Sequence, residues 1–318
     1  MKKLLVSVVN YCDPEFYSTI FSLWSQAKNK KELYFSIVSE DNKQYNLSFI
    51  PNKQLFYRHF DLSEYRGGVC WARELATQVD IEYDYFIQFD SHTHASPGWD
   101  VMAIERYEKL KINDENFIIC YAPADYEIMP SGAINLDAIV KSSMYGSFFA
   151  ELIPGFKFPG YSVLEIDQVV RSYWATCCYL FAPKKWVNEV GINDEESFNT
   201  EEFALSLRTY AKNWKIYSIG TRDVFHNQSH RQANGSVTRE ILRPWADDRK
   251  EPYWKHVEES TNRLSMLMSG QLDVPKEKVS AFFIESGIDT KYLEFIPNYV
   301  SHVFVEHRSL GMPPRRDK

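Results

Sequence analysis

The sequence predicts an α/β protein in which helices cover a largely parallel β-sheet. Residues 4–9 form an apolar run rich in β-branched side chains, which is typical of a central strand buried on both faces. Apolar side chains recur at helical spacing over residues 16–24, and a second strand pattern follows at 33–38. A strand, a helix and a second strand in this order form a β-α-β unit, which requires parallel pairing and a crossover helix.

The remaining elements extend this pattern. Asp13 and Pro14 are expected to open the first helix, Asp13 as the N-cap and Pro14 at the first helical position. From about residue 238 helical patterns dominate, so we expect a catalytic-type α/β domain over 1–238 and a helical extension over 239–318. The further expected elements are a helix at 69–78, strands at 83–90 and 117–122, a strand-rich core at 172–183, and helices at 203–214, 253–268, 276–285 and 290–295.

Composition excludes several classes of protein. The chain has 318 residues, 44% of them hydrophobic and 25% charged, which excludes a disordered polymer. Its net charge of −7 and the lack of a basic run argue against a nucleic-acid partner. Five cysteines without a CxxC pair favour a reducing compartment, and no apolar run approaches the roughly 20 residues of a membrane span. We therefore expect a cytoplasmic protein without a transmembrane segment.

The most informative segment is the end of the strand at 83–90, where Asp90, Ser91 and His92 follow one another. Residues i and i+2 of an extended chain point the same way, so the side chains of Asp90 and His92 can both be directed at one point at the carboxyl edge of the sheet. One oxygen and one nitrogen ligand suit Mn²⁺ or a similar divalent cation such as Mg²⁺, with a diphosphate completing the shell. The alternative is that Asp90 caps a turn and His92 is a surface histidine.

Two other groups of charged residues have a functional and a structural interpretation. Arg66 and Arg73 flank a Gly-Gly turn at a helix start, where guanidinium groups and free backbone amides suit a diphosphate. They could equally be a surface pair that stabilises a loop. Glu201 and Glu202 open a helix, where the helix dipole favours acids without any function. Of two adjacent carboxylates, only one is expected to face a cleft.

Five segments occur in the order found in a known enzyme family. The segment 90–100, with Asp90-Ser91-His92 and Gly98-Trp99-Asp100, resembles the metal-binding DSH…GWD segment of the polypeptide α-N-acetylglucosaminyltransferases. Segments 7–15, 66–73, 201–208 and 224–226 resemble the family's VSIxSYRDPE, GPxxAR, EEIxxALR and VxH motifs. The mucin-type polypeptide GalNAc-transferases share part of this pattern. The resemblance implies a GT-A fold, a Rossmann-like mixed sheet flanked by helices, and a retaining, metal-dependent transfer from UDP-GlcNAc.

The resemblance also implies roles for individual residues. His226 is the third metal ligand beside Asp90 and His92, in preference to its neighbour His230. Asp194 joins Glu201 and Glu202 as a catalytic candidate near the donor sugar and the acceptor hydroxyl. The loop at 10–13 lies near the uracil and ribose, with Cys12 where the family has arginine. The donor-binding residues implied in this way are Val9, Asn10, Tyr11, Asp13, Arg66, Gly68, Arg73, Asp90 and Ser91.

The sequence thus predicts a retaining glycosyltransferase that moves a sugar, GlcNAc in the first instance, from a UDP-sugar to a hydroxyl of a protein or glycan. UDP-GalNAc or UDP-Glc as donor, a cell-surface glycan as acceptor, and a degenerate sugar-binding module that has lost catalysis remain alternatives. Trp174 and Trp186 could stack on sugars, but core packing is expected for both. The loops expected to bind the acceptor, such as residues 126–161, contain no recognisable motif, and no sequence pattern indicates the oligomeric state.

Overall fold

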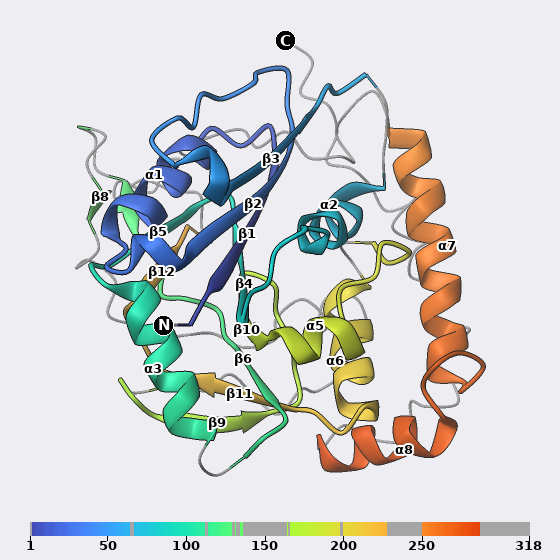
Figure 1. Ribbon diagram of the computed structural model, residues 1–318. Coiled ribbons are helices and arrows are strands. Elements are labelled where there is room, and N and C mark those ends of the chain that lie inside the picture. Colours follow the sequence, from blue (N-terminus) through green and yellow to red (C-terminus); the bar gives the residue numbers. More distant parts are fainter. Residues whose placement is uncertain are drawn as a thin grey trace.

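The computed structural model describes residues 2–63, 67–111, 114–128, 131, 134–135, 164, 166–197, 200–227 and 250–286. Within these residues, eight strands form one mixed sheet in the order β3-β2-β1-β4-β10-β6-β11-β9 (Figure 1). The strands are β1 (Leu4–Tyr11), β2 (Leu33–Glu40), β3 (Leu55–Phe60), β4 (Tyr85–Asp90), β6 (Phe117–Cys120), β9 (Val169–Ser172), β10 (Tyr179–Pro183) and β11 (Lys215–Ile219). Strands β3, β2, β1 and β4 are mutually parallel, as the opening β-α-β pattern predicts.

The order of these strands determines where a ligand can bind. The chain leaves β1 toward β2 and β3 on one side and later returns to place β4 on the other side. At such a switch point the loops diverge, so a crevice opens at the carboxyl ends of the two strands. Asp90 ends β4 and is in register with Val9 of β1, which places it at this crevice.

Helices cover both faces of the sheet (Figure 1). Alternate residues of β1 enter different clusters: Leu4, Val6 and Val8 pack with α1 (Phe16–Gln26) and α3 (Trp99–Lys111), while Leu5 and Val9 face the other side. That other face is covered by α2 (Gly68–Thr77), α5 (Lys184–Glu189) and α6 (Glu201–Ala211). A strand buried on both faces needs the near-continuous apolar sequence seen in β1.

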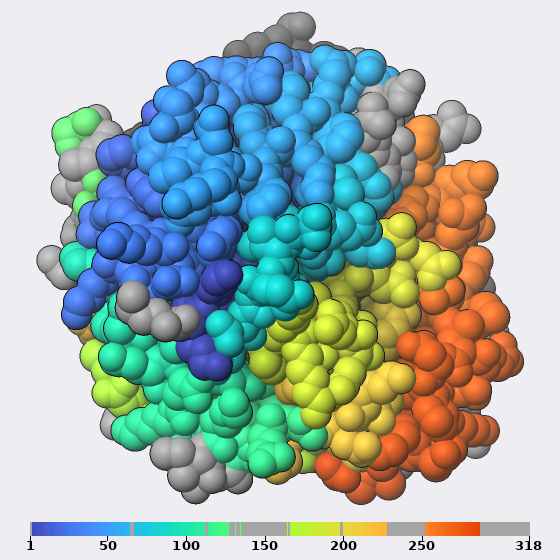
Figure 2. Space-filling view, viewed as in Figure 1, coloured from blue at the N-terminus to red at the C-terminus, as the bar shows by residue number. Residues whose placement is uncertain are grey.

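The helices after residue 250 pack on the α/β part of the chain. Helices α7 (Lys250–Met268) and α8 (Lys276–Glu285) share one apolar cluster with α6, in which Phe203 and Leu207 contact residues such as Leu267 and Phe282. In the space-filling view their orange surface lies directly against the yellow surface of the α6 region (Figure 2). No helix among the described residues is long and apolar enough to cross a membrane.

Three expected local features differ in the structure. The first helix begins at Phe16, and Asp13 does not cap it; its carboxylate accepts a hydrogen bond from the Glu15 backbone amide at 2.8 Å in the preceding turn. The segment 172–183 contains the last residue of β9 and the whole of β10, and residues 173–178 between them are the connection. Helix α6 stops at Ala211, since Asn213 adopts a left-handed conformation (φ 60°) that a helix cannot continue.

Other expected elements are present or lie outside the described residues. The helices at 253–268 and 276–285 correspond to α7 and α8. The helix expected at 290–295 and most of the acceptor loop at 126–161 fall outside the described part of the chain. The structure also contains elements that the sequence pattern did not identify: β3, α3, α5, β11, the 3-10 turns Lys30–Glu32 and Asn52–Gln54, the strands β7 (Glu127–Ile128) and β8 (Ile134–Asn135), and the strand β5 (Thr93–Ala95).

Candidate functional site

A short antiparallel ribbon brings three distant side chains together at the carboxyl end of β4. The strand β12 (Val224–His226) pairs with β5, and His226 is in register with Thr93. The backbone amide of Asn227 donates to the carbonyl oxygen of His92 at 3.1 Å, which fixes the two chain segments side by side. His226 therefore lies next to His92, and their ring centroids are 4.6 Å apart.

Asp90, His92 and His226 form a cluster whose candidate ligand atoms all lie within 4.8 Å of one another. Burial opposes ionisation of Asp90, but a hydrogen bond from His226 and the positive charge of Arg73 hold the pKa of Asp90 well below its usual range. Burial also lowers the pKa of His226, which favours the neutral imidazole. An ionised carboxylate and a neutral imidazole are the protonation states that metal binding requires, so Asp90 and His226 fit a divalent cation.

Arg73 links the metal-site candidate to helix α6. Its guanidinium contacts Asp90 Oδ1 at 2.7 Å through one nitrogen and Glu201 Oε2 through the other, and its side chain is only 4% exposed. Both neighbouring carboxylates are therefore paired with the same buried cation. The structure places Arg73 in an internal ion-pair network, with its two terminal nitrogens directed at protein carboxylates.

Hydrogen bonds connect the end of β1 and the loop that follows it to the site. Asn10 donates to Ser39 Oγ at 2.8 Å, and its own side-chain oxygen accepts from the Asp13 amide at 2.9 Å. Asp13 Oδ2 lies 2.7 Å from Ser91 Oγ and 2.7 Å from His92 Nδ1. Of the sequence-predicted donor residues, Asn10, Asp13 and Ser91 thus form one hydrogen-bonded group, whereas Asp90 contacts Arg73 and His226. Val9 and Tyr11 belong to the same strand end as Asn10.

The two glutamates at the start of α6 have different surroundings. Glu201 is 3% exposed and paired with Arg73. Glu202 is less buried, and its carboxylate lies 3.4 Å from both Trp174 Nε1 and the Cys177 amide. Burial raises the pKa of both glutamates. After burial, the charges of Asp90 and Glu202 both raise the pKa of the Cys178 thiol.

Comparison with protein-family models decides the class of the protein. A model described as Glycosyltransferase (GlcNAc) matches residues 43–292, most of the chain. The chain belongs to this glycosyltransferase family. A search of curated proteins finds no significant match.

Solved structures with the same arrangement are also glycosyltransferases. TarS of S. aureus superposes with a TM-score of 0.51 at 12% identity, covering 99% of this chain and 46% of TarS. GalNAc-T7 with UDP, GalNAc and Mn²⁺ superposes with a TM-score of 0.48 at 12% identity, covering 96% of this chain and 59% of GalNAc-T7. The mannosyltransferase PcManGT from Pyrobaculum calidifontis with GDP-Man and Mn²⁺ superposes with a TM-score of 0.48 at 7% identity, covering 99% of this chain and 77% of PcManGT. The chain spans about half the length of the first two. The mixed sheet and its flanking helices are those of a GT-A glycosyltransferase.

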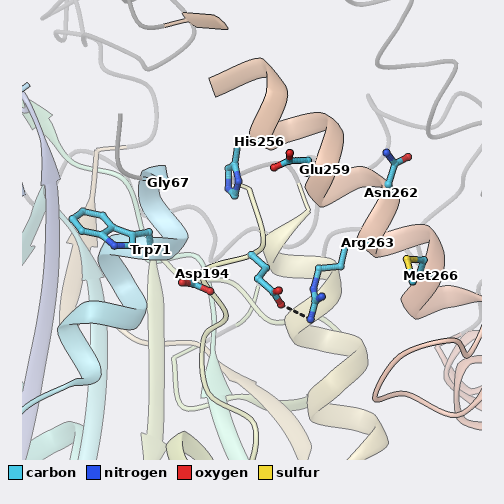
Figure 3. Close-up of a pocket in the computed structure, with 9 residues that line it drawn as sticks. Gly67, Trp71, Asp194, His256, Glu259, Asn262, Arg263 and Met266 are labelled. Atoms are coloured by element: carbon cyan, nitrogen blue, oxygen red, sulfur yellow. Dashed lines mark ion pairs between the residues drawn. The ribbon is translucent and has the colours of Figure 1, made fainter. Parts of the chain in front are cut away.

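The glycosyltransferase also has a surface hollow, which lies between helix α2, helix α7 and the loop that precedes α6. The hollow has a volume of about 550 Å³ (Figure 3). Trp71 forms one side, and the Arg263–Glu195 ion pair of 2.5 Å crosses the other. Asp194 lies in this hollow, exposed, with its amide bonded to the Glu74 carboxylate at 2.6 Å. The lining residues are Gly67, Trp71, Asp194, Glu195, His256, Glu259, Asn262, Arg263 and Met266.

The remaining sequence candidates divide into described and undescribed residues. Arg66 and His230 lie outside the described residues, and so does the loop 198–199 before α6. Gly68 begins α2 with a φ of 74°, which supports the expected Gly-Gly turn. Trp174 and Trp186 are 6% and 0% exposed, so both are core residues as expected.

Sequence reasoning missed the buried carboxylate of Glu15. It accepts hydrogen bonds from the Tyr126 hydroxyl and from Asn227 Nδ2, the latter at 2.8 Å. Asn227 directly follows His226, so Glu15 braces the chain beside a candidate metal ligand. The only local signal for this role is an acid directly before the first helix, and the helix dipole alone would explain an acid at that position.

Proposed function

We propose that this glycosyltransferase transfers GlcNAc from UDP-GlcNAc to a hydroxyl group with retention of configuration. The observation that carries the proposal is the Asp90–His92–His226 cluster at the β1/β4 switch point of a chain in the GlcNAc glycosyltransferase family. A nucleotide sugar bound at the carboxyl ends of β1 and β4 would direct its diphosphate toward this cluster.

The residues of the cluster would hold a divalent cation, for which we propose Mn²⁺ or Mg²⁺. A cation bound there supplies positive charge that stabilises the departing diphosphate. Arg73 binds Oδ1 of Asp90, so Oδ2 of Asp90 remains on the side of His226, 3.1 Å from the His226 Nε2. The protein thus fixes the orientation of its only anionic group in this cluster before donor binding.

We assign the two glutamates to different tasks. Glu201 fixes Arg73, whereas Glu202, which accepts a hydrogen bond from the buried Trp174, faces the donor sugar and the acceptor hydroxyl. No side chain of the described site stands out as a nucleophile, so the proposed mechanism is a front-face displacement in which the departing phosphate accepts the acceptor's proton. We expect Glu202→Gln to retain the α-anomeric product by NMR, and a trapped glycosyl-enzyme would contradict this mechanism.

For the acceptor we propose a protein or glycan that enters through the hollow between α2 and α7. An aromatic face beside carboxylate and amide groups suits the apolar face and hydroxyls of a sugar or a polypeptide segment. In this interpretation Asp194 contacts the acceptor. The variant Trp71→Ala should raise the KM for acceptor and leave acceptor-independent donor hydrolysis unchanged, whereas an equal loss of both activities would contradict an acceptor role.

The domain arrangement and the location are part of the same proposal. We propose a catalytic domain over 1–238 and a helical extension over 239–318 whose helix α7 forms the outer wall of the acceptor site. All five cysteines are free thiols in described positions, and this supports the proposed cytoplasmic location.

A UDP-release assay over UDP-GlcNAc, UDP-GalNAc and UDP-Glc, with Mn²⁺, Mg²⁺ or EDTA, tests the donor assignment. We expect metal-dependent turnover with UDP-GlcNAc to exceed that with the other donors. Preference for UDP-GalNAc or UDP-Glc would overturn the GlcNAc assignment while leaving the metal site in place.

A further inference from the structure

Asp13 makes contacts that differ from those of a nucleotide-binding residue. Its side chain is 3% exposed, and it lies 79 residues before His92 in the chain. Oδ1 accepts the Glu15 amide at 2.8 Å, and Oδ2 accepts Ser91 Oγ at 2.7 Å and meets His92 Nδ1 at 2.7 Å. Each oxygen of the carboxylate is thus occupied by a group of the protein.

These contacts assign the proton on the His92 ring. A backbone amide and a serine hydroxyl both donate to Asp13, so its carboxylate acts as an acceptor at each oxygen. A 2.7 Å contact between this acceptor and Nδ1 requires Nδ1 to carry the hydrogen. In the neutral ring the lone pair of His92 is then on Nε2, the nitrogen that can coordinate a metal ion.

The same loop also stabilises the second histidine. Glu15, two residues after Asp13, binds Asn227 beside His226, and the Tyr126 hydroxyl that donates to Glu15 comes from the segment after β6. The loop between β1 and α1 therefore contacts both histidine-bearing segments. Asp13 acts on one histidine directly, and Glu15 acts on the chain next to the other.

We propose that Asp13 is a positioning residue for the metal site: its carboxylate holds His92 in the Nδ1–H tautomer so that Nε2 faces the cation. This inference rests on the metal site proposed above. It replaces the donor-binding role that the sequence implied for Asp13 with a role in metal affinity. Carboxylates in this position behind a histidine ligand typically contribute 10- to 100-fold to metal affinity.

The first test uses the metal-free wild-type protein and requires no activity. Long-range ¹H–¹⁵N spectra report the tautomer of each histidine, and the His92 signals are assigned by their loss in His92→Gln. We expect the Nδ1–H tautomer for His92. The Nε2–H tautomer in the wild-type protein would overturn the proposal, whether or not any variant folds.

The second test measures Mn²⁺ binding by calorimetry without nucleotide. Asp13→Asn replaces one acceptor oxygen by an NH₂ group, which then faces a hydrogen-bond donor of the protein. We therefore expect a Kd for Mn²⁺ at least 10-fold higher than that of the wild type. Asp100→Asn is the matched control, because Asp100 is equally buried (1% exposed) and accepts hydrogen bonds from the backbone amides of Lys28 and Asn29. Its Kd for Mn²⁺ should be unchanged.

Turnover then separates this inference from the proposed function. At saturating Mn²⁺, a positioning role predicts that Asp13→Asn recovers most of its activity and keeps the wild-type KM for UDP-sugar. A raised KM for donor with an unchanged Kd for Mn²⁺ would show that Asp13 binds the nucleotide and would overturn the inference. If the wild type binds Mn²⁺ but turns over no UDP-sugar, the proposed function fails while the inference on Asp13 stands.

Discussion

Replacing Arg73 by methionine would test the network that supports the site. The arginine is buried between Asp90 and Glu201, whose side chains are 22% and 3% exposed. Asp90 keeps its contact with His226 in the variant, but Glu201 is left as a buried carboxylate without a cation. Breaking a buried ion pair on one side typically destabilises a protein by about 3–5 kcal/mol, and Glu201 dominates this figure because it is more buried.

The free energy of unfolding in urea, measured with EDTA, is the assay. EDTA is needed because bound Mn²⁺ at about 100 times its Kd would itself add about 2.7 kcal/mol. Arg208→Met is the matched control: Arg208 is 6% exposed and pairs with buried Glu196 at 3.0 Å, without contact to Asp90. Both variants should lose stability, but only Arg73→Met should weaken Mn²⁺ binding or turnover per folded molecule. Wild-type stability of Arg73→Met would refute the argument.

Three further predictions use other parts of the structure. His226→Gln should raise the Kd for Mn²⁺ at least 10-fold while His230→Gln leaves it unchanged, and calorimetry would detect the reverse. Asp100→Asn should lower the free energy of unfolding by about 1–3 kcal/mol, since the new NH₂ group replaces one acceptor oxygen and leaves one of two partly buried backbone amides without an acceptor, and a urea titration checks it. Burial alone would raise the pKa of Asp84, but the Lys3 amide and Lys2 hold it below the usual value. The contribution of ionised Asp84 to the free energy of unfolding is therefore present at neutral pH and lost as pH falls below about 4. Asp84→Asn should accordingly flatten the acid limb of a stability–pH curve.

Local pattern was sufficient to predict the scaffold and two of the three residues of the candidate metal site. The apolar run of β1 and the strand ending at Asp90 are periodic over a few residues, so their place in a parallel sheet can be read from sequence. The i, i+2 spacing of Asp90 and His92 is also local. The third member required the family resemblance, because only the pairing of β12 with β5 brings His226 to the site.

The partners of charged residues could not be predicted in this way. Arg73 and Glu201 are 128 residues apart, and nothing near Arg73 in the sequence distinguishes an internal ion pair from a diphosphate ligand. Asp13 precedes a proline and a helix, which is the usual pattern of an N-cap, yet its carboxylate bonds to Ser91 and His92 instead. In each case a contact between distant segments overrides the local preference.

The most direct test of the account is calorimetric titration of UDP-GlcNAc into the wild-type protein and Asp90→Ala, each with Mn²⁺ and with EDTA. The account predicts that the wild type binds the nucleotide sugar tightly only when Mn²⁺ is present and that Asp90→Ala loses this metal-dependent gain. Equal affinity in all four conditions would show that the Asp90–His92–His226 cluster is not the donor's metal site and would contradict the proposal.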